Sequence, residues 1–315
     1  MSSATTTLPE PAAAAAPGSF RAGVVEFLLV GGATLVLFPL AWLLRARLGR
    51  DASEIAAAAF TFHAALLINN PHFAVTYLLF YKDVRKRAFG PELPRTQRAR
   101  YIVSGLLVPL ALLGWAASAV TTGSARSMGN MIQLMFFLVG WHYVKQGFGI
   151  LTVLSARRGV RFSPLERNVI LAHCFAAWAH AWASPADPGR ELEEKGVVFT
   201  SIPHPPALEL VTAIAFALSA LALVAILVRK WQHERRIPPL VPLTGFLISV
   251  WLWTVYSNVD PLMMYVIPAL HSLQYLYMVW LLKRNEARAA EGPPLFGKLV
   301  ALRLGVLALS AIALG

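Results

Sequence analysis

Long apolar stretches, separated by short polar and basic segments, dominate the pattern of the chain. About 20 apolar residues in a helix are enough to cross about 30 Å of hydrocarbon. Such stretches predict membrane spans at 24–44, 55–81, 101–121, 129–154, 167–184, 207–228, 238–257, 261–282 and 296–314. We therefore expect an all-α protein, a polytopic transmembrane helix bundle with eight or nine spans.

The composition supports this reading. Hydrophobic residues make up 57% of the 315 residues and charged residues only 14%, and the mean hydropathy is +0.58, which differs from the composition of soluble domains. Residues 23–315 are predicted to form a single transmembrane helical domain. Residues 1–22, which are rich in Ala, Pro and Thr, are predicted to be a disordered N-terminal segment.

The formal net charge of +12 does not indicate a nucleic-acid partner, because the basic residues are concentrated in alternate loops. These loops are 82–100 and the segments that follow the fourth, sixth and eighth predicted spans. This distribution is typical of cytoplasmic loops in membrane proteins. We expect an integral protein of a bacterial inner (plasma) membrane, with its N-terminus in the cytoplasm and the lipid bilayer as its main partner.

Six of the eight histidines fall inside predicted spans: His63, His72, His142, His173, His180 and His271. Ionisable side chains at membrane depth are rare and usually functional, although a single histidine can also serve as a polar contact between helices. Counting 1.5 Å per residue puts His72, His142, His173 and His271 at one depth, on four different helices. Four such imidazoles can converge on a metal ion. His63 and His180 lie nearer the outer face and are second-rank ligands.

The residues around these histidines suggest which metal they would bind. The spans contain only two acidic residues, Glu26 and Glu209, and the chain contains one cysteine, Cys174, so carboxylates and thiolates are scarce. Imidazole ligands suit iron, copper or zinc, and non-haem iron is the preferred interpretation. A b-type haem held by two histidines is the alternative, since Gly140, Gly147 and Gly149 flank His142.

Three further residues are candidate catalytic groups. Lys145 is a cation inside a predicted span and would hold an anionic group, while Tyr143 and Tyr275 would line an apolar slot beside the histidines. Pro71 removes a backbone donor, so we expect a kink that turns His72 inward.

The stretches PHFAVTY at 71–77 and HSLQYL at 271–276 resemble motifs of the Brp/Blh family, membrane enzymes that cleave β-carotene into retinal. The resemblance implies that His72 and His271 are iron ligands. The chain departs from the family pattern in two places. Thr76 or a neighbour stands where the family has an aspartate, and Tyr275 stands where it has a second histidine.

Two classes of function remain. The first is a histidine-ligated non-haem metal oxidoreductase or oxygenase that uses dioxygen and a lipophilic substrate. The alternative is a non-catalytic membrane protein, either a haem-binding electron carrier or a transporter with a histidine proton relay.

Overall fold

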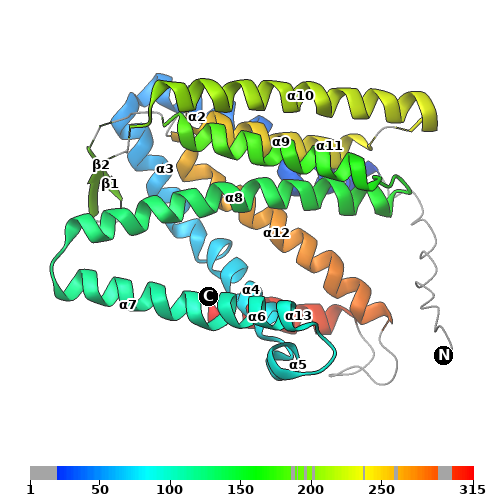
Figure 1. Cartoon of the computed structure of the whole chain (residues 1–315), viewed down its shortest axis with the longest axis horizontal. Coiled ribbons are helices and arrows are strands. Elements are labelled where there is room, and N and C mark those ends of the chain that lie inside the picture. Colours follow the sequence, from blue (N-terminus) through cyan, green and yellow to red (C-terminus); the bar gives the residue numbers. More distant parts are fainter. Residues whose placement is uncertain are drawn as a thin grey trace.

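The computed structural model describes residues 20–185, 189, 191–194, 197–200, 203–236, 238–258, 262–289 and 300–315 (Figure 1). The predicted disordered segment 1–22 lies outside the described residues as far as residue 19. The first helix begins at Phe20, so the last three residues of that segment are helical.

The described chain is helical apart from one short hairpin. The first elements are α1 (Phe20–Phe27), η1 (Leu28–Gly32), α2 (Thr34–Leu48), α3 (Arg50–Ala65), α4 (Asn69–Tyr81), α5 (Val84–Phe89), α6 (Arg95–Ile102), η2 (Val103–Leu107), α7 (Val108–Thr121) and α8 (Ala125–Arg157). They are followed by α9 (Pro164–Ala183), β1 (Glu191–Glu194), β2 (Val197–Thr200), α10 (Pro206–Glu234), α11 (Leu240–Leu247), η3 (Ile248–Val255), η4 (Tyr256–Asn258), α12 (Leu262–Ala289) and α13 (Val300–Leu314). Strands β1 and β2 pair antiparallel, with Glu191 opposite Thr200.

Several helices are long and apolar enough to cross a membrane. Among the described residues these are Arg50–Tyr81, Arg95–Thr121, Pro206–Glu234 and Leu262–Arg288. A fifth span results if Phe20–Gly32 and Thr34–Leu48, which meet at a bend of 58°, count as one.

The predicted number of eight or nine spans is therefore not reached, although a helix occurs at each predicted position. Helix α8 is long enough, but polar side chains such as Asn130, Gln133 and Gln146 interrupt its apolar sequence. The apolar helices Leu240–Val255 and Ala301–Leu314 have between 10 and 17 residues each. At 1.5 Å per residue such a helix is at most about 26 Å long, which is shorter than the hydrocarbon core of about 30 Å.

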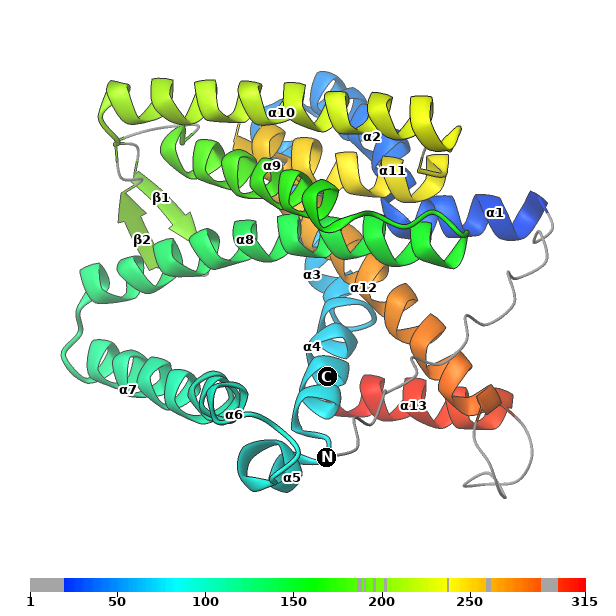
Figure 2. The ribbon, with the colours of Figure 1, turned by 45° about the vertical axis from the view of Figure 1, so that its right-hand side comes forward.

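Helix α12 runs obliquely through the molecule and contacts most of the elements at its centre. Helix α9 packs between α8 and α10, and these three helices run side by side in Figures 1 and 2. Helix α12 contacts α3, α4 and η1 along its length, and α13 packs against both α4 and α12. Hydrogen bonds from Gln146 also join α8 to the middle of α12.

The helix is interrupted before Pro71 rather than kinked at it. Ile68 has φ −124° and ψ −60°, outside helical values, and α4 begins at Asn69. Pro71 is thus in the first turn of α4, where its missing N–H costs no hydrogen bond within the helix. Both Pro71 and His72 are buried.

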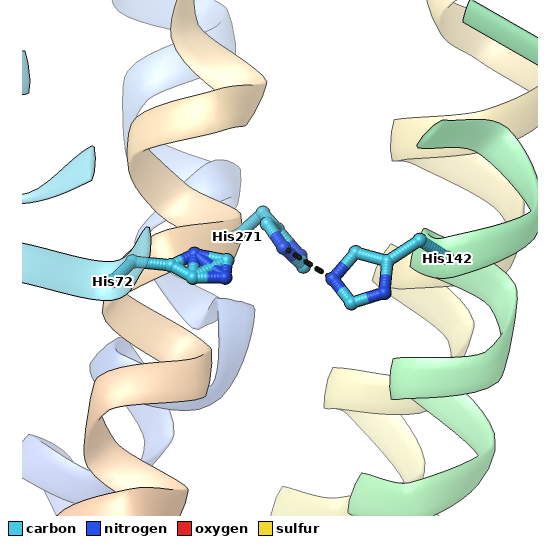
Figure 3. A group of neighbouring side chains, drawn as sticks. All are labelled: His72, His142 and His271. Carbon is cyan, nitrogen blue, oxygen red and sulfur yellow. Dashed lines mark hydrogen bonds between the residues drawn. The ribbon is translucent and has the colours of Figure 1, made fainter. Parts of the chain in front are cut away.

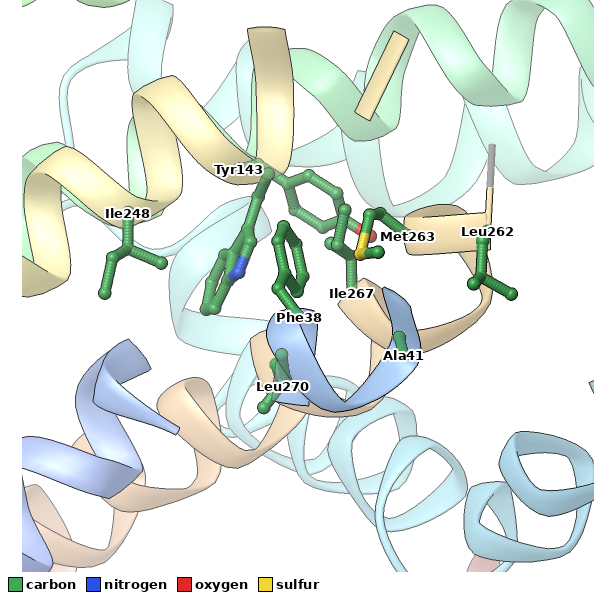
Figure 4. Close-up of a cluster of buried hydrophobic side chains, with 9 residues drawn as sticks. Phe38, Ala41, Tyr143, Ile248, Leu262, Met263, Ile267 and Leu270 are labelled. Atoms are coloured by element: carbon green, nitrogen blue, oxygen red, sulfur yellow. The ribbon is translucent and has the colours of Figure 1, made fainter. Parts of the chain in front are cut away.

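Two segments with wide, π-helical turns lie against α12. In η1, Gly31 has φ +130°, a conformation open to glycine but strained for other residues. In η3, Trp253 is fully buried and belongs to a hydrophobic cluster (Figure 4). The cluster contains Phe38, Ala41, Tyr143, Ile248, Trp253, Leu262, Met263, Ile267 and Leu270.

Small residues allow the helices to approach closely at two points. A Cβ atom at Gly147 of α8 would lie 2.8 Å from the Cβ atom of Ser249 in η3. A Cβ atom at Gly245 of α11 would lie 2.7 Å from the carbonyl oxygen of Val30 in η1. Glycine at such contacts is common in membrane helix packing, because it lets the backbones touch.

The two glycines of α8 provide a matched test of this packing. Gly147→Ala should destabilise the protein by about 1–3 kcal/mol through overpacking. Gly149→Ala should be neutral or stabilising by about 0.5–1 kcal/mol, because nothing lies within 4 Å of its Cβ position. The midpoint of thermal unfolding in detergent measures both, and equal midpoints would contradict the close contact.

Candidate metal centre

Three histidines from three different helices meet in the interior. His72 comes from α4, His142 from α8 and His271 from α12 (Figure 3). One ring nitrogen from each lies within 4.8 Å of the others. His72 and His271 are buried and His142 is half-buried. The group combines residues that are far apart in the sequence.

The closest contact joins His142 and His271, whose Nε2 atoms are 3.1 Å apart. Without a metal, this contact is a hydrogen bond in which one Nε2–H donates to the other ring. With a metal–nitrogen bond of about 2.0–2.1 Å, two neighbouring ligands of one ion have nitrogens about 2.9–3.4 Å apart. The separation therefore fits a hydrogen bond and also fits two adjacent ligands of one ion.

Ser272 orients the ring of His72. Its Oγ lies 3.3 Å from His72 Nδ1, and both residues are buried. This leaves Nε2 of His72 free to bind a ligand, the arrangement in which a metal-binding histidine is held by its second nitrogen. The sequence reasoning did not name Ser272, although it directly follows His271 in the chain.

Gln146 connects the helix of His142 to the helix of His271. Its Nε2 donates to the carbonyl oxygen of His271 at 3.1 Å and to Oε1 of Gln274 at 2.7 Å. Because Gln146 lies one turn after His142 on α8, these bonds join α8 to α12 beside the histidine pair. The side chain of Gln146 thus bonds to the other glutamine and to the backbone rather than to a histidine ring.

Gln274 extends this connection to the two π-helical segments. Its Nε2 donates to the carbonyl oxygen of Val30 in η1 at 2.5 Å and to Oγ of Ser249 in η3 at 3.3 Å. Ser249 donates in turn to the carbonyl oxygen of Gly245 at 2.9 Å. Gln274 is completely buried, so its amide joins α12, α8, η1 and η3 at one point.

One polar atom of the group has no partner. Nδ1 of His271 is buried and makes no hydrogen bond with the residues that the structure describes. An unsatisfied buried polar group costs about 1–3 kcal/mol. Either this nitrogen keeps an unpaired N–H while Nε2 binds a ligand, or it presents a free lone pair.

Aromatic rings surround the three histidines. The ring of Tyr143 is 4.6 Å from that of His271, and Trp253 lies edge-on to His271 at 6.4 Å. Tyr275 lies 4.5 Å from the ring of His72. Two of the candidate catalytic residues, Tyr143 and Tyr275, therefore contact the histidine rings. Trp253, which the sequence reasoning did not single out, contacts them as well.

The other three predicted ligands lie elsewhere. His173 is buried on α9, where its Nδ1 lies 3.0 Å from Ser219 Oγ. His180 has Nδ1 3.4 Å from Thr212 Oγ1, and His63 has Nδ1 2.7 Å from the carbonyl oxygen of Ala59 in its own helix. His173 was predicted at the same depth as the group, but it faces α10 and not α12.

Lys145 also faces away from the three histidines. Its Nζ lies 5.5 Å from the ring centre of Phe148 and 5.9 Å from that of Phe175 on α9. Two of the glycines expected to make room for a haem serve helix contacts instead. A Cβ at Gly140 would meet Trp178, and a Cβ at Gly147 would meet Ser249.

Comparison of the chain with protein-family models, with curated proteins and with solved structures gives no match. The resemblance to the Brp/Blh family therefore stays a prediction. His72 and His271, which that resemblance implies as iron ligands, are two members of the histidine group.

Replacing Gln274 tests the polar connection between the helices. Gln274→Leu removes the hydrogen bonds to Val30 and Ser249 and leaves buried polar groups unpaired, so it should destabilise the protein by about 1–3 kcal/mol per unpaired group. Gln232→Leu, at an exposed position near the end of α10, is the control with the same change of side chain. A similar fall in the unfolding midpoint for both variants would contradict the assigned role.

Proposed function

We propose that this chain is an integral membrane protein that binds one transition-metal ion through His72, His142 and His271. The observation that carries the proposal is the convergence of three imidazoles, one from each of three helices, within 4.8 Å. The chain separates these residues by 70 and more positions, so local sequence does not explain their meeting. Helices present such ligands rigidly, which suits a metal site.

The ligand type favours iron, copper or zinc. Histidine is the only residue type in the group among the described residues, and neutral imidazoles suit these metals better than magnesium or calcium. Three protein ligands leave at least one coordination position open, as in catalytic sites. We propose non-haem iron as the ion, which the implied ligands of the family resemblance also favour.

The spacing of His142 and His271 disfavours a haem between them. Two axial ligands on opposite sides of one iron lie about 4 Å apart, twice a metal–nitrogen bond. The observed 3.1 Å between their Nε2 atoms instead suits ligands on adjacent positions. Haem ligation by another pair of histidines is the alternative. An absorption spectrum distinguishes haem from non-haem iron.

We propose an oxidoreductase or oxygenase reaction on a lipophilic substrate at this site. The ion would supply the capacity to bind and activate dioxygen. Tyr143, Trp253 and Tyr275 would form the apolar wall against which the substrate is oriented and from which water is excluded. Phe73 stacks on His72 at 5.2 Å and is itself 58% exposed, so α4 offers an apolar route from the bilayer to the histidines.

One observation favours the non-catalytic alternative. The contact between His142 and His271 has the length of a hydrogen bond, and two imidazoles in that arrangement can pass a proton between them. In that case the group would serve a proton relay without a metal.

Metal content distinguishes these possibilities. Purified protein should contain about one iron per chain by elemental analysis, without the Soret band of a haem. His142→Ala and His271→Ala should each lose the metal, because two ligands hold an ion much more weakly than three. His63→Ala, at a histidine whose ring bonds to the carbonyl oxygen of Ala59 in its own helix, should keep it.

Retention of iron by both the His142 and His271 variants would contradict the site. If the wild-type protein binds no metal even after reconstitution with Fe(II) under anaerobic conditions, the histidines are better explained as a proton relay.

The Ser272 hydroxyl gives a finer test. Ser272→Ala should weaken metal binding about 10–100-fold, the usual effect of losing an outer partner of a ligating histidine. Ser155→Ala is the matched control, because Ser155 is equally buried but its Oγ makes no hydrogen bond with the described residues. Competition with a chromophoric chelator measures the affinity, and equal affinities in the two variants would remove Ser272 from the site.

A further inference from the structure

A row of alternating rings and cations lies where α8 and α9 meet, away from the histidine group. Lys145 lies between the rings of Phe148 and Phe175, at 5.5 Å and 5.9 Å. The guanidinium of Arg167 lies 5.8 Å from the same Phe148 ring. Lys145 therefore contacts both rings, and Arg167 contacts the Phe148 ring as well. We call these four residues, Phe175, Lys145, Phe148 and Arg167, the cation–aromatic row.

The Arg167 end of the row lies at the level where a membrane span ends. Its neighbour Glu166 accepts from Lys230 Nζ at 3.3 Å, and Lys230 also pairs with Glu234 at 2.9 Å. Lys230 and Glu234 belong to the last turns of α10, one of the helices able to cross a membrane. The phosphate groups of lipids lie at this boundary between apolar and charged residues.

Neither cation of the row has an anionic partner among the residues that the structure describes. Glu166, the carboxylate next in sequence to Arg167, is already used by Lys230 and by the backbone N–H of Ser163 at 2.6 Å. Contact with the face of an aromatic ring compensates a cation only in part. Because Lys145 lies inside a helix pair at membrane depth, an anion from outside the chain would stabilise it.

The surface around the row indicates an amphiphilic ligand. Arg167 is exposed, Phe175 is 39% exposed, and Leu165 in the first turn of α9 is 63% exposed. An inorganic anion would gain nothing from these apolar side chains, whereas the acyl chains of a lipid would cover them. Lysine and arginine together form strong, charge-assisted hydrogen bonds to a phosphate.

We propose that the cation–aromatic row binds the phosphate of an anionic phospholipid, with Arg167 and Lys145 as its ligands. The acyl chains lie along the exposed face of α8 and α9 beside Phe175. This site is separate from the histidine group and does not depend on whether that group binds a metal. It makes a lipid phosphate the anionic group that Lys145 holds.

The test uses the full chain purified in a non-ionic detergent. Thermal unfolding is followed with added phosphatidylglycerol, with phosphatidylcholine and with inorganic phosphate. Phosphatidylglycerol should raise the midpoint well above the values with the other two. The double variant Lys145→Gln with Arg167→Gln should lower the apparent affinity for phosphatidylglycerol roughly tenfold or more, since each basic group contributes to attraction of anionic lipid.

Two further variants provide the controls. Arg161→Gln with Arg229→Gln removes the same charge from two exposed positions outside the row and should keep the wild-type affinity. Lys145→Arg with Arg167→Lys keeps both charges and should retain most of the affinity. If the first double variant does not fold, Arg167→Gln alone, at an exposed position, should still show a clear loss.

Three results would overturn the proposal. The first is an equal effect of phosphatidylglycerol on wild type and on the row variants. The second is an equal loss in the Arg161/Arg229 control, which would mean a general attraction of charge. The third is full stabilisation by inorganic phosphate, which would mean that the row is an anion site without a lipid.

Discussion

The amide of Gln274 is the constraint around which the centre of the molecule is arranged. Backbone and side-chain polar groups in an apolar interior must find partners within the protein, because no water is present to replace them. Gln274 gives its two N–H bonds to η1 and η3, and it accepts one from Gln146 of α8. Its position on α12 therefore fixes the depth and rotation at which these elements meet.

The histidine group depends on this junction. His271 precedes Gln274 by less than one turn of α12, and His142 precedes Gln146 by one turn of α8. The two amides that hold α8 against α12 consequently also hold the two imidazoles at 3.1 Å. The wide turns of η1 and η3, together with Gly31, Gly147 and Gly245, bring the backbones close enough for these bonds. Packing of small residues and satisfaction of polar groups thus support one another.

Polar residues in an apolar chain have separate roles in this structure. Histidines predicted to lie at one depth divide between the group on α4, α8 and α12 and the contacts of α9 with α10. Lys145 follows His142 by only three residues on α8, yet its side chain faces α9 and the aromatic rings of the cation–aromatic row. A polar residue in an apolar stretch indicates that a partner exists, and the neighbouring helix decides which partner the side chain meets.

The sequence by itself determined that the chain is helical, where its helices lie, and that His72, His142 and His271 deserve attention. Apolar stretches of sufficient length and rare polar residues within them are local signals, and they are readable without contacts. It did not place the ends of the helices, on which the count of four or five candidate spans depends. Nor did it predict the break before Pro71, or that His173 faces away from the other three histidines. Only the tertiary structure decided these points, because the rotation of each helix is set by packing across it, at Gly147 against Ser249 and at Gln274 against Val30.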